Sequence, residues 1–455
     1  MVMTFLLLAL MIIAETGFII LAGKDISKGN WSFKRMMVNA GQLVLFLASV
    51  LLPGIDLSFR FTGLLILLGI RIIFAVIFYL INRKKVQKKK SAGKIFSLIM
   101  SVLLIAGSLL PAFVFTDYKG LPVSGLYSVK MSRAILIDKN RIEEFEDDGS
   151  YREVPAYFFA PEDAPAGSRF PLIVFSHGAF GYYESNASTY LELASHGYVV
   201  VSIEHPYHSF FTQDTDGKTV IVDSGFMNSV MNADQTEEEI FAASQEWMSL
   251  RVADMDFAVD ELIKGADNDI ENYWFSDEDS RADVLNALSE LDSDKIGLMG
   301  HSMGGATSVE VANQRDDIDA VIDIDGTMLG SITGASGDRY VVEDIEYKVP
   351  VFEIENMNAH EEALEAERID YPYPNNMIRK NADVYFSTYF EGSLHMDFTD
   401  LPLFSPFLAK MLGSGDVDNE YVMSTVNSLA LDFFDCYLKG NGQFSCEDSY
   451  PGVRK

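Results

Sequence analysis

The chain has 455 residues and a formal net charge of −31. This length exceeds that of one ordinary domain, so two or more structural units are expected. The negative charge would repel phosphate backbones, which excludes nucleic acid as an expected partner. The charge is unevenly divided, because residues 1–116 carry +10 and the remainder therefore carries −41.

The front of the chain is apolar and basic. It contains four apolar stretches, at 3–22, 36–52, 61–81 and 95–115. Each approaches or reaches the roughly 20 residues that a helix needs to cross a hydrocarbon core, although the second is marginal. We predict a membrane region of about four transmembrane helices over 1–116, with three spans and a re-entrant segment as the alternative. Glu15 and Arg71 lie inside spans, so they are expected to pair or to face a polar cavity.

The loops between these stretches predict an orientation. The first and third loops hold four and seven basic residues, whereas the second holds only Arg60. Basic loops stay on the cytoplasmic side, which places the N-terminus and the C-terminal domain on the extracytoplasmic side of a cell membrane. Cys436 and Cys446 would be able to pair there, with two free thiols as the alternative. No cluster has metal-ligand spacing, so neither a metal nor another cofactor is expected.

Beyond residue 117, short apolar runs alternate with amphipathic stretches. Runs typical of buried parallel strands lie at 171–176, 198–203, 295–299, 320–324, 349–354 and 384–390. Segment 244–264 repeats apolar residues every three or four positions, which predicts a helix packed on the core, and 421–439 predicts a closing helix. The alternation predicts an α/β domain over 117–455 with a mainly parallel sheet. Segment 208–240 does not follow this alternation of strands and helices and is a candidate lid.

One motif points to chemistry. Residues 300–304 read Gly-His-Ser-Met-Gly, which follows a predicted strand and precedes small residues that open a helix. This context is that of a nucleophile elbow, a strained strand-to-helix turn that exposes a serine hydroxyl. Ser302 is therefore the predicted nucleophile, and the fold class is the α/β-hydrolase fold.

A serine hydroxyl needs a base and an acid that orients the base, which follow in the order Ser, Asp or Glu, His in this fold. His395 comes just after the last predicted strand, whereas His360 lies in a charged stretch. We predict His395 as the base. Asp325 is favoured over Asp323 as the acid, because it stands next to a glycine where a loop leaves the sheet.

The oxyanion hole needs two backbone N–H groups. Met303 follows the nucleophile and supplies one of them. The loop His177-Gly178-Ala179-Phe180-Gly181 follows a predicted strand and supplies the other, with Ala179 as the expected donor and Phe180 as the alternative.

Five segments together resemble one family. They are FSHGAFG (175–181), VVVSIEHPYHS (199–209), GHSMGGAT (300–307), IDGTM (324–328) and GSLHMDF (392–398). Over most of residues 150–440 the chain resembles the platelet-activating-factor acetylhydrolase family of α/β-hydrolases. The resemblance implies a calcium-independent esterase that removes short or truncated acyl groups, with Ser302, Asp325 and His395 as its triad.

The leading hypothesis is a membrane-anchored serine hydrolase of carboxylic esters, with a small-molecule or lipid ester as substrate and the membrane as its surroundings. One alternative is an acyltransferase, in which an alcohol replaces the water that resolves the acyl-enzyme. Another is a catalytically silent membrane sensor or adhesion protein. The complete Ser-His-Asp set argues against the silent protein. The sequence leaves the oligomeric state open.

Overall fold

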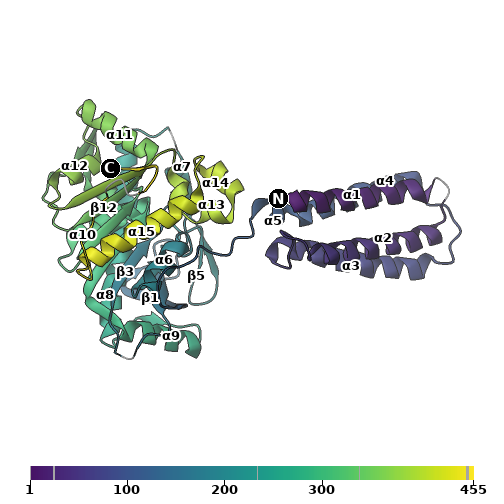
Figure 1. Ribbon diagram of the computed structural model, residues 1–455, viewed down its shortest axis with the longest axis horizontal. Helices are drawn as coiled ribbons and strands as arrows, with labels where there is room; N and C mark the ends of the chain where they lie inside the picture. Colours follow the sequence, from purple (N-terminus) through teal and green to yellow (C-terminus); the bar gives the residue numbers. More distant parts are fainter. Residues whose placement is uncertain (1, 24–25, 166, 233, 338, 447–449) are drawn as a thin grey trace. The chain divides into compact units, whose positions relative to one another are not determined.

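A computed structural model describes the whole chain except residues 1, 24–25, 166, 233, 338 and 447–449 (Figure 1). The chain forms two compact units. The first comprises Met1–Lys119 with Leu403–Leu408, and the second comprises Gly120–Pro402 with Ala409–Lys455. The division thus falls at residues 119/120, against the 116/117 expected from hydropathy, and a short C-terminal segment is grouped with the first unit.

The first unit is helical. Its helices are α1 (Val2–Ala22), α2 (Lys28–Ser49), α3 (Phe59–Asn82), α4 (Ser91–Ser108) and the short α5 (Leu110–Val114). Among the described residues, α1, α3 and α4 are long and apolar enough to cross a membrane. Helix α2 falls short because polar side chains such as Lys34, Asn39 and Gln42 interrupt it.

Buried charges link the helices of this unit. Glu15 in α1 is fully buried and forms ion pairs with Arg35 in α2 and Arg71 in α3. Arg71 also donates to Asn39 and Ser101. The expected pairing of the charges inside the spans is therefore confirmed.

The two basic loops lie together at one end of the helices. The backbone N–H of Lys28 donates to the carbonyl of Gln87 over 2.8 Å, and Lys89 donates to Ile26 over 3.0 Å. Helices α1 to α4 therefore alternate in direction, so the two loops with the most lysines share a side of this unit.

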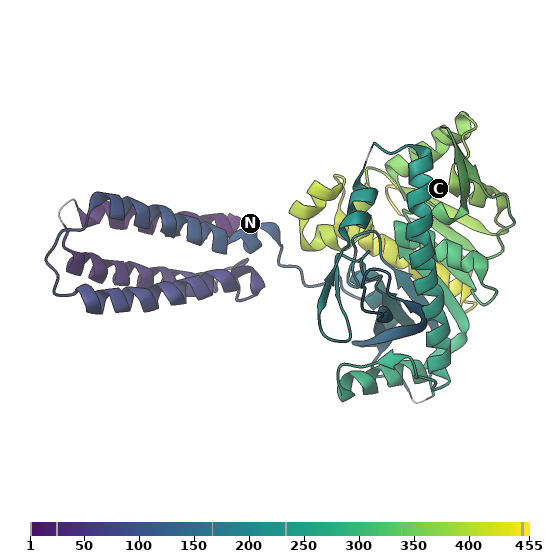
Figure 2. The same ribbon diagram turned by 180° about the vertical axis from the view of Figure 1, so that it is seen from behind.

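The second unit is built on one large sheet (Figures 1 and 2). Its described strands run in the order β14-β13-β12-β9-β8-β3-β4-β2-β1-β7. They span Val129–Ile142 (β1), Tyr151–Pro161 (β2), Phe170–Ser176 (β3), Val199–Ile203 (β4), Tyr273–Trp274 (β7), Leu291–His301 (β8), Ala320–Ile324 (β9), Val351–Asn356 (β12), Tyr385–Phe390 (β13) and Val453–Arg454 (β14). The strands from β13 to β4 are parallel, and β14, β2, β1 and β7 are antiparallel to their neighbours.

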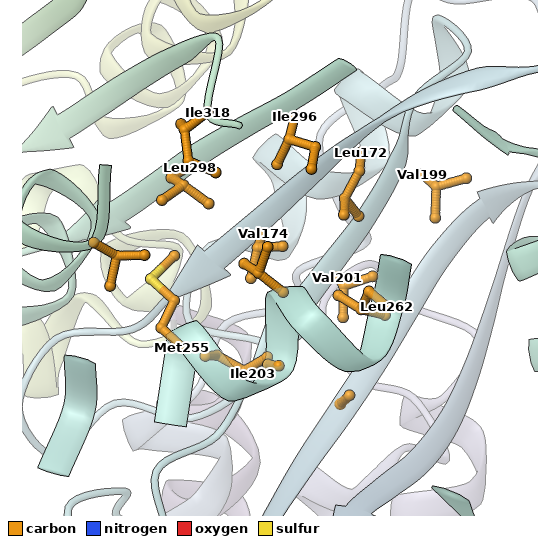
Figure 3. Close-up of a cluster of buried hydrophobic side chains, with 14 of the residues drawn as sticks. Leu172, Val174, Val199, Val201, Ile203, Met255, Leu262, Ile296, Leu298 and Ile318 are labelled. Carbon is orange, nitrogen blue, oxygen red and sulfur yellow. The ribbon is translucent and has the colours of Figure 1, made fainter. Parts of the chain in front are cut away.

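Helices cover both faces of this sheet. Helices α8 (Glu237–Ala266), α9 (Glu278–Ser289) and α10 (Met303–Gln314) pack on one face, and α6 (Ala187–Ser195) and α15 (Asn419–Tyr437) pack on the other. Figure 3 shows the first core, where Met255 and Leu262 of α8 lie against strand residues such as Val174 and Val201. Alternate strand residues, Ile173 and Phe175, enter the opposite core.

The remaining elements are short. They are β5 (Phe211–Gln213), β6 (Thr219–Ile221), α7 (Ser224–Met231), β10 (Ile332–Ser336), β11 (Arg339–Val342), α11 (Met357–Arg368), α12 (Pro374–Asn381), α13 (Leu401–Phe404) and α14 (Pro406–Leu412), with 3-10 turns at Leu329–Ser331 and His395–Phe398. Elements β5, β6 and α7 fall within the segment 208–240.

The architecture confirms the expected α/β-hydrolase fold, with a parallel sheet between helices and a helical region before it. All six predicted strands occur within a few residues of their expected bounds. Sequence analysis missed β1 and β2, whose polar residues interrupt the apolar runs by which the parallel strands were found. Cys436 is half-buried and Cys446 is buried, and both thiols are free.

Candidate active site

Ser302 lies in the turn between β8 and α10. Its backbone adopts φ 57° and ψ −126°, which a residue with a side chain rarely adopts and which lifts the serine out of the sheet. A Cβ on Gly300 would overlap the backbone of Gly304, and a Cβ on Gly304 would overlap the carbonyl of Ser176. The two glycines are therefore required by the close approach of the backbone at this turn.

His395 and Asp325 meet at the same edge of the sheet. Asp325 follows β9 and His395 follows β13, and His395 Nδ1 lies 2.6 Å from the Asp325 carboxylate. The Asp325 side chain is 1% exposed, whereas the His395 side chain is 42% exposed. Ser302 and His395 both line one cavity of about 500 Å³. The fold thus brings the three predicted residues to one site, with the imidazole open to an incoming molecule.

Asn356 is part of this arrangement and was missed by sequence analysis. It ends β12, and its backbone N–H and side-chain Nδ2 each donate to Asp325 over 2.7 Å. Burial raises the pKa of Asp325, but the hydrogen bonds from His395 and Asn356 outweigh burial and hold that pKa below its usual value. The carboxylate is therefore ionised and oriented. The sequence offered one indication of this role, which is that Asn356 stands near the carboxyl end of a predicted strand.

His301 was also missed as a supporting residue. Its ring lies 4.7 Å from that of His395, and its Nε2 donates to the His395 carbonyl over 3.1 Å. Burial lowers the pKa of His301 to about 3, so the ring is neutral. This contact fixes the backbone that carries the candidate base.

The alternatives considered for the acid and the base lie elsewhere. Asp323 is inside β9, fully buried, and accepts the backbone N–H of Gly326 over 3.1 Å. Burial and the neighbouring Glu353 raise the pKa of Asp323 well above its usual value. His360 contacts Glu355 and stacks on Tyr389 with ring centroids 3.9 Å apart. Neither residue contacts the imidazole of His395 among the described interactions.

The candidate oxyanion donors surround Ser302. The backbone N–H of Phe180 already donates to the carbonyl of His208 over 3.1 Å, which leaves Ala179 as the donor that the loop after β3 offers. Met303 opens α10, and the first N–H groups of a helix have no partner within it. A Cβ on Gly178 would lie 3.1 Å from the Ser302 Cβ, so this loop passes directly beside the serine.

The cavity is lined by two chemically different sets of residues. Glu353, Glu355 and Glu362 form an acidic set, and Arg379 pairs with the first two. Burial and the neighbouring Glu353 raise the pKa of Glu355. The lining also includes the apolar side chains Met303, Leu329 and Leu394.

The candidate lid packs against Met303, one of the apolar lining residues. Phe226 of α7 packs with Trp247 and Met303 in a buried cluster that Ala179 and Phe180 adjoin. Residues of segment 208–240 therefore lie beside both candidate oxyanion donors.

The comparisons with known proteins agree with this architecture. The family described as "Platelet-activating factor acetylhydrolase, isoform II" matches residues 151–452. The chain is 27% identical over 295 residues to platelet-activating factor acetylhydrolase of Cavia porcellus, covering 63% of this chain and 61% of the relative. It is 25% identical over 324 residues to the Bos taurus protein of the same name, covering 65% of each. The match thus spans less than two thirds of the length of these relatives.

A solved structure shares the fold. Ferulic acid esterase from Streptomyces cinnamoneus superposes with a TM-score of 0.52 at 17% identity, over 73% of this chain and 97% of that one. The family match covers more than half of the chain, including the elbow and the segments that carry Asp325 and His395. The chain therefore belongs to the platelet-activating factor acetylhydrolase family, as its five recognised segments had indicated.

Proposed function

We propose that this protein is a membrane-anchored serine hydrolase of carboxylic esters. The observation that carries the proposal is the 2.6 Å contact between His395 Nδ1 and Asp325, at a cavity that Ser302 also lines. Family membership supports the same reaction class, since the relatives are named acetylhydrolases.

The proposed reaction proceeds through an acyl-enzyme. His395 removes the proton from Ser302, and the serine oxygen attacks the ester carbonyl. The N–H groups of Ala179 and Met303 bind the oxyanion, while Asp325 stabilises the imidazolium. The protonated imidazole then gives its proton to the leaving alcohol. A water molecule, activated by the same imidazole, releases the acid and regenerates the serine.

The cavity lining supports an ester with a short acyl chain. Met303, Leu329 and Leu394 supply a small apolar surface, and much of the remaining lining is polar or acidic. So small an apolar surface suits a short acyl chain more than a long one, because a long chain would leave apolar area against polar groups. We therefore propose phospholipids with short or truncated acyl chains as substrates, in keeping with the names of the relatives.

The reaction is tested on the full-length protein in detergent. A fluorophosphonate probe is expected to label wild-type protein and not Ser302→Ala, because the probe reacts with an activated serine. A labelling pattern that does not depend on Ser302 would refute the proposal. A panel of p-nitrophenyl esters and truncated-chain phospholipids then ranks the substrates, and product analysis with added alcohols separates hydrolysis from acyl transfer.

The proposed location is the outer face of a cell membrane. Three helices fit the length of a bilayer, and α2 completes an antiparallel set in which both basic loops share one end. With four spans and those loops in the cytoplasm, the hydrolase unit lies outside. Protease added to intact cells is expected to digest the hydrolase unit, whereas protection until the membrane is opened would place it in the cytoplasm.

A further inference from the structure

A buried arginine holds the loop that carries a candidate oxyanion donor. Arg251 lies on the covered face of α8 and is 0% exposed. Its Nη1 donates to the carbonyl of His177 over 2.6 Å, and its Nη2 donates to the carbonyl of Gly178 over 3.3 Å. Both carbonyls belong to the loop after β3. Burial lowers the pKa of Arg251 to about 9, so the guanidinium is still charged at neutral pH.

The geometry of the peptide group gives these contacts a consequence. In a planar trans peptide, the C=O and the N–H of the next residue point in opposite directions. The carbonyl of Gly178 shares its peptide with the N–H of Ala179, and the carbonyl of His177 shares its peptide with the N–H of Gly178. Arg251 shares the Gly178 carbonyl with the backbone N–H of Gly181, over 3.0 Å, and with His177 Nδ1, over 2.7 Å. Because Arg251 holds the His177 carbonyl and helps to hold the Gly178 carbonyl, both N–H groups point away from it. Successive N–H groups that face one way form an anion-binding concavity.

A second hydrogen-bonded chain stabilises the start of the same loop. Ser176 Oγ lies 2.8 Å from His205 Nε2, and His205 Nδ1 lies 3.1 Å from Asp254. Burial lowers the pKa of His205 to about 4, so the ring is neutral, accepts from Ser176 and donates to Asp254. These groups are in the order of a catalytic triad, but Ser176 is 0% exposed and cannot reach a substrate. The chain therefore has a structural role.

Asp254 connects the two sets of contacts. It lies three residues after Arg251 on α8 and accepts from Arg152 over 2.7 Å. Arg152 also donates to Glu143 and to the carbonyl of Pro206. The charges that surround the loop are thus paired with one another. The guanidinium of Arg251 is directed at the two backbone carbonyls and, through its Nε, at His208 Nδ1 over 3.4 Å.

We infer that Arg251 is a positioning residue for catalysis, which acts by aiming the N–H of Ala179 at the oxyanion formed at Ser302. The inference rests on the proposed hydrolase function and adds to it a residue that does not itself touch the substrate. A guanidinium is suited to this position because its planar fork donates to two acceptors at once, whereas an ammonium is a point donor on a flexible chain.

The test compares Arg251→Met and Arg251→Lys in the full-length protein. A matched control is Arg315→Met, because Arg315 pairs with Asp256 and Asp260 on the same helix but lies outside the loop contacts. Activity is measured on p-nitrophenyl butyrate and on the corresponding thionoester. The sulfur of a thionoester is a weak hydrogen-bond acceptor, so the ratio of the two rates reports on the oxyanion donors.

Arg251→Met is expected to lower kcat on the oxygen ester on the order of 10²-fold, as loss of an oxyanion donor does, with KM changed less than about threefold. The ester-to-thionoester ratio should fall with it. Arg251→Lys should retain an intermediate ratio, and Arg315→Met should keep the wild-type ratio even if its melting temperature drops.

An unchanged ratio in Arg251→Met, with kcat lost or not, would overturn the positioning role. If Arg251→Met does not fold, Arg251→Lys decides the question in its place. A wild-type ester-to-thionoester ratio in Arg251→Lys would show that a side chain donating to both carbonyls at once is not required. Failure of the proposed function is distinguishable, because wild-type protein would then show neither turnover nor fluorophosphonate labelling.

Discussion

Both units of this protein bury arginines, but the partners of those arginines differ. In the helical unit, Arg35 and Arg71 share the single carboxylate of Glu15. In the hydrolase unit, Arg152 and His205 satisfy Asp254, and Arg251 donates to the backbone. Backbone carbonyls inside a helix are mostly bonded within it, so the buried charges between these helices bond to one another and to polar side chains such as Asn39 and Ser101. A loop leaves its carbonyls free, and a buried cation there can orient the peptide groups.

This difference predicts that activity and folding respond to separate substitutions. Changes at the hydrolase site should alter rates with little effect on stability, whereas changes at the helical cluster should do the reverse.

The largest effect is expected for Ser302→Ala. Loss of the nucleophile should reduce kcat by about 10⁴-fold or more, because the remaining groups have nothing to activate. The melting temperature should stay within a few degrees of wild type, since none of the described hydrogen bonds involves the Ser302 side chain and the backbone contact with Ile324 is kept. Steady-state kinetics and circular dichroism check both. A large loss of stability would show that the two kinds of effect are not separable.

Glu15→Gln should affect the other unit. It leaves Arg35 and Arg71 without a counter-charge, and removal of one partner from a buried ion pair costs about 3 kcal/mol or more. Unfolding of the helical unit in detergent should therefore occur at a lower temperature, while kcat on a soluble ester stays unchanged. Glu278→Gln is the matched control, because its pair with Arg281 is exposed. Equal melting temperatures for the two variants would contradict this expectation.

Asn356→Ala should have a smaller effect that depends on pH. The substitution removes the Nδ2 donor to Asp325 and leaves the backbone donor, so the pKa of Asp325 should rise toward its usual value. The ionised carboxylate, present at neutral pH, is lost as pH falls through that pKa, so activity should decline at a higher pH than in wild type. We expect about a tenfold loss of kcat/KM at neutral pH and a larger loss at acidic pH. A pH profile that coincides with that of wild type would contradict this expectation. Asn376→Ala is the control, because the Asn376 side chain donates to the carbonyl of Ala363 and not to Asp325.

The smallest effect is expected from reductant. Cys436 and Cys446 are free thiols, so dithiothreitol should change neither the melting temperature nor kcat. Burial raises the pKa of Cys446 to about 12, so this thiol should also react slowly with alkylating reagents in the folded protein. A drop in melting temperature on reduction would reveal a disulfide and lend support to an oxidising location.

The sequence alone determined the parts of the molecule that rest on local pattern. Continuous apolar runs marked the parallel strands, because such strands are buried on both faces. The elbow at Ser302 was readable because a strained turn permits few residue types, and chain order then pointed to His395 and Asp325. The apolar stretches pointed to a membrane region and the charge of the loops to an orientation, because both signals add up along the sequence.

Tertiary structure decided which polar groups work together. Arg251 and Asp254 stand on the covered face of a helix that the sequence predicted as core packing, and nothing local shows that backbone carbonyls face one of them. Asn356 ends an apolar strand, and its role appears only when β12 pairs beside β9. The ion pair of Glu15 with Arg71 likewise joins residues that are 56 positions apart and meet only when the helices pack. Hydrogen bonds depend on distance in space, and only the folded chain brings these residues within reach of each other.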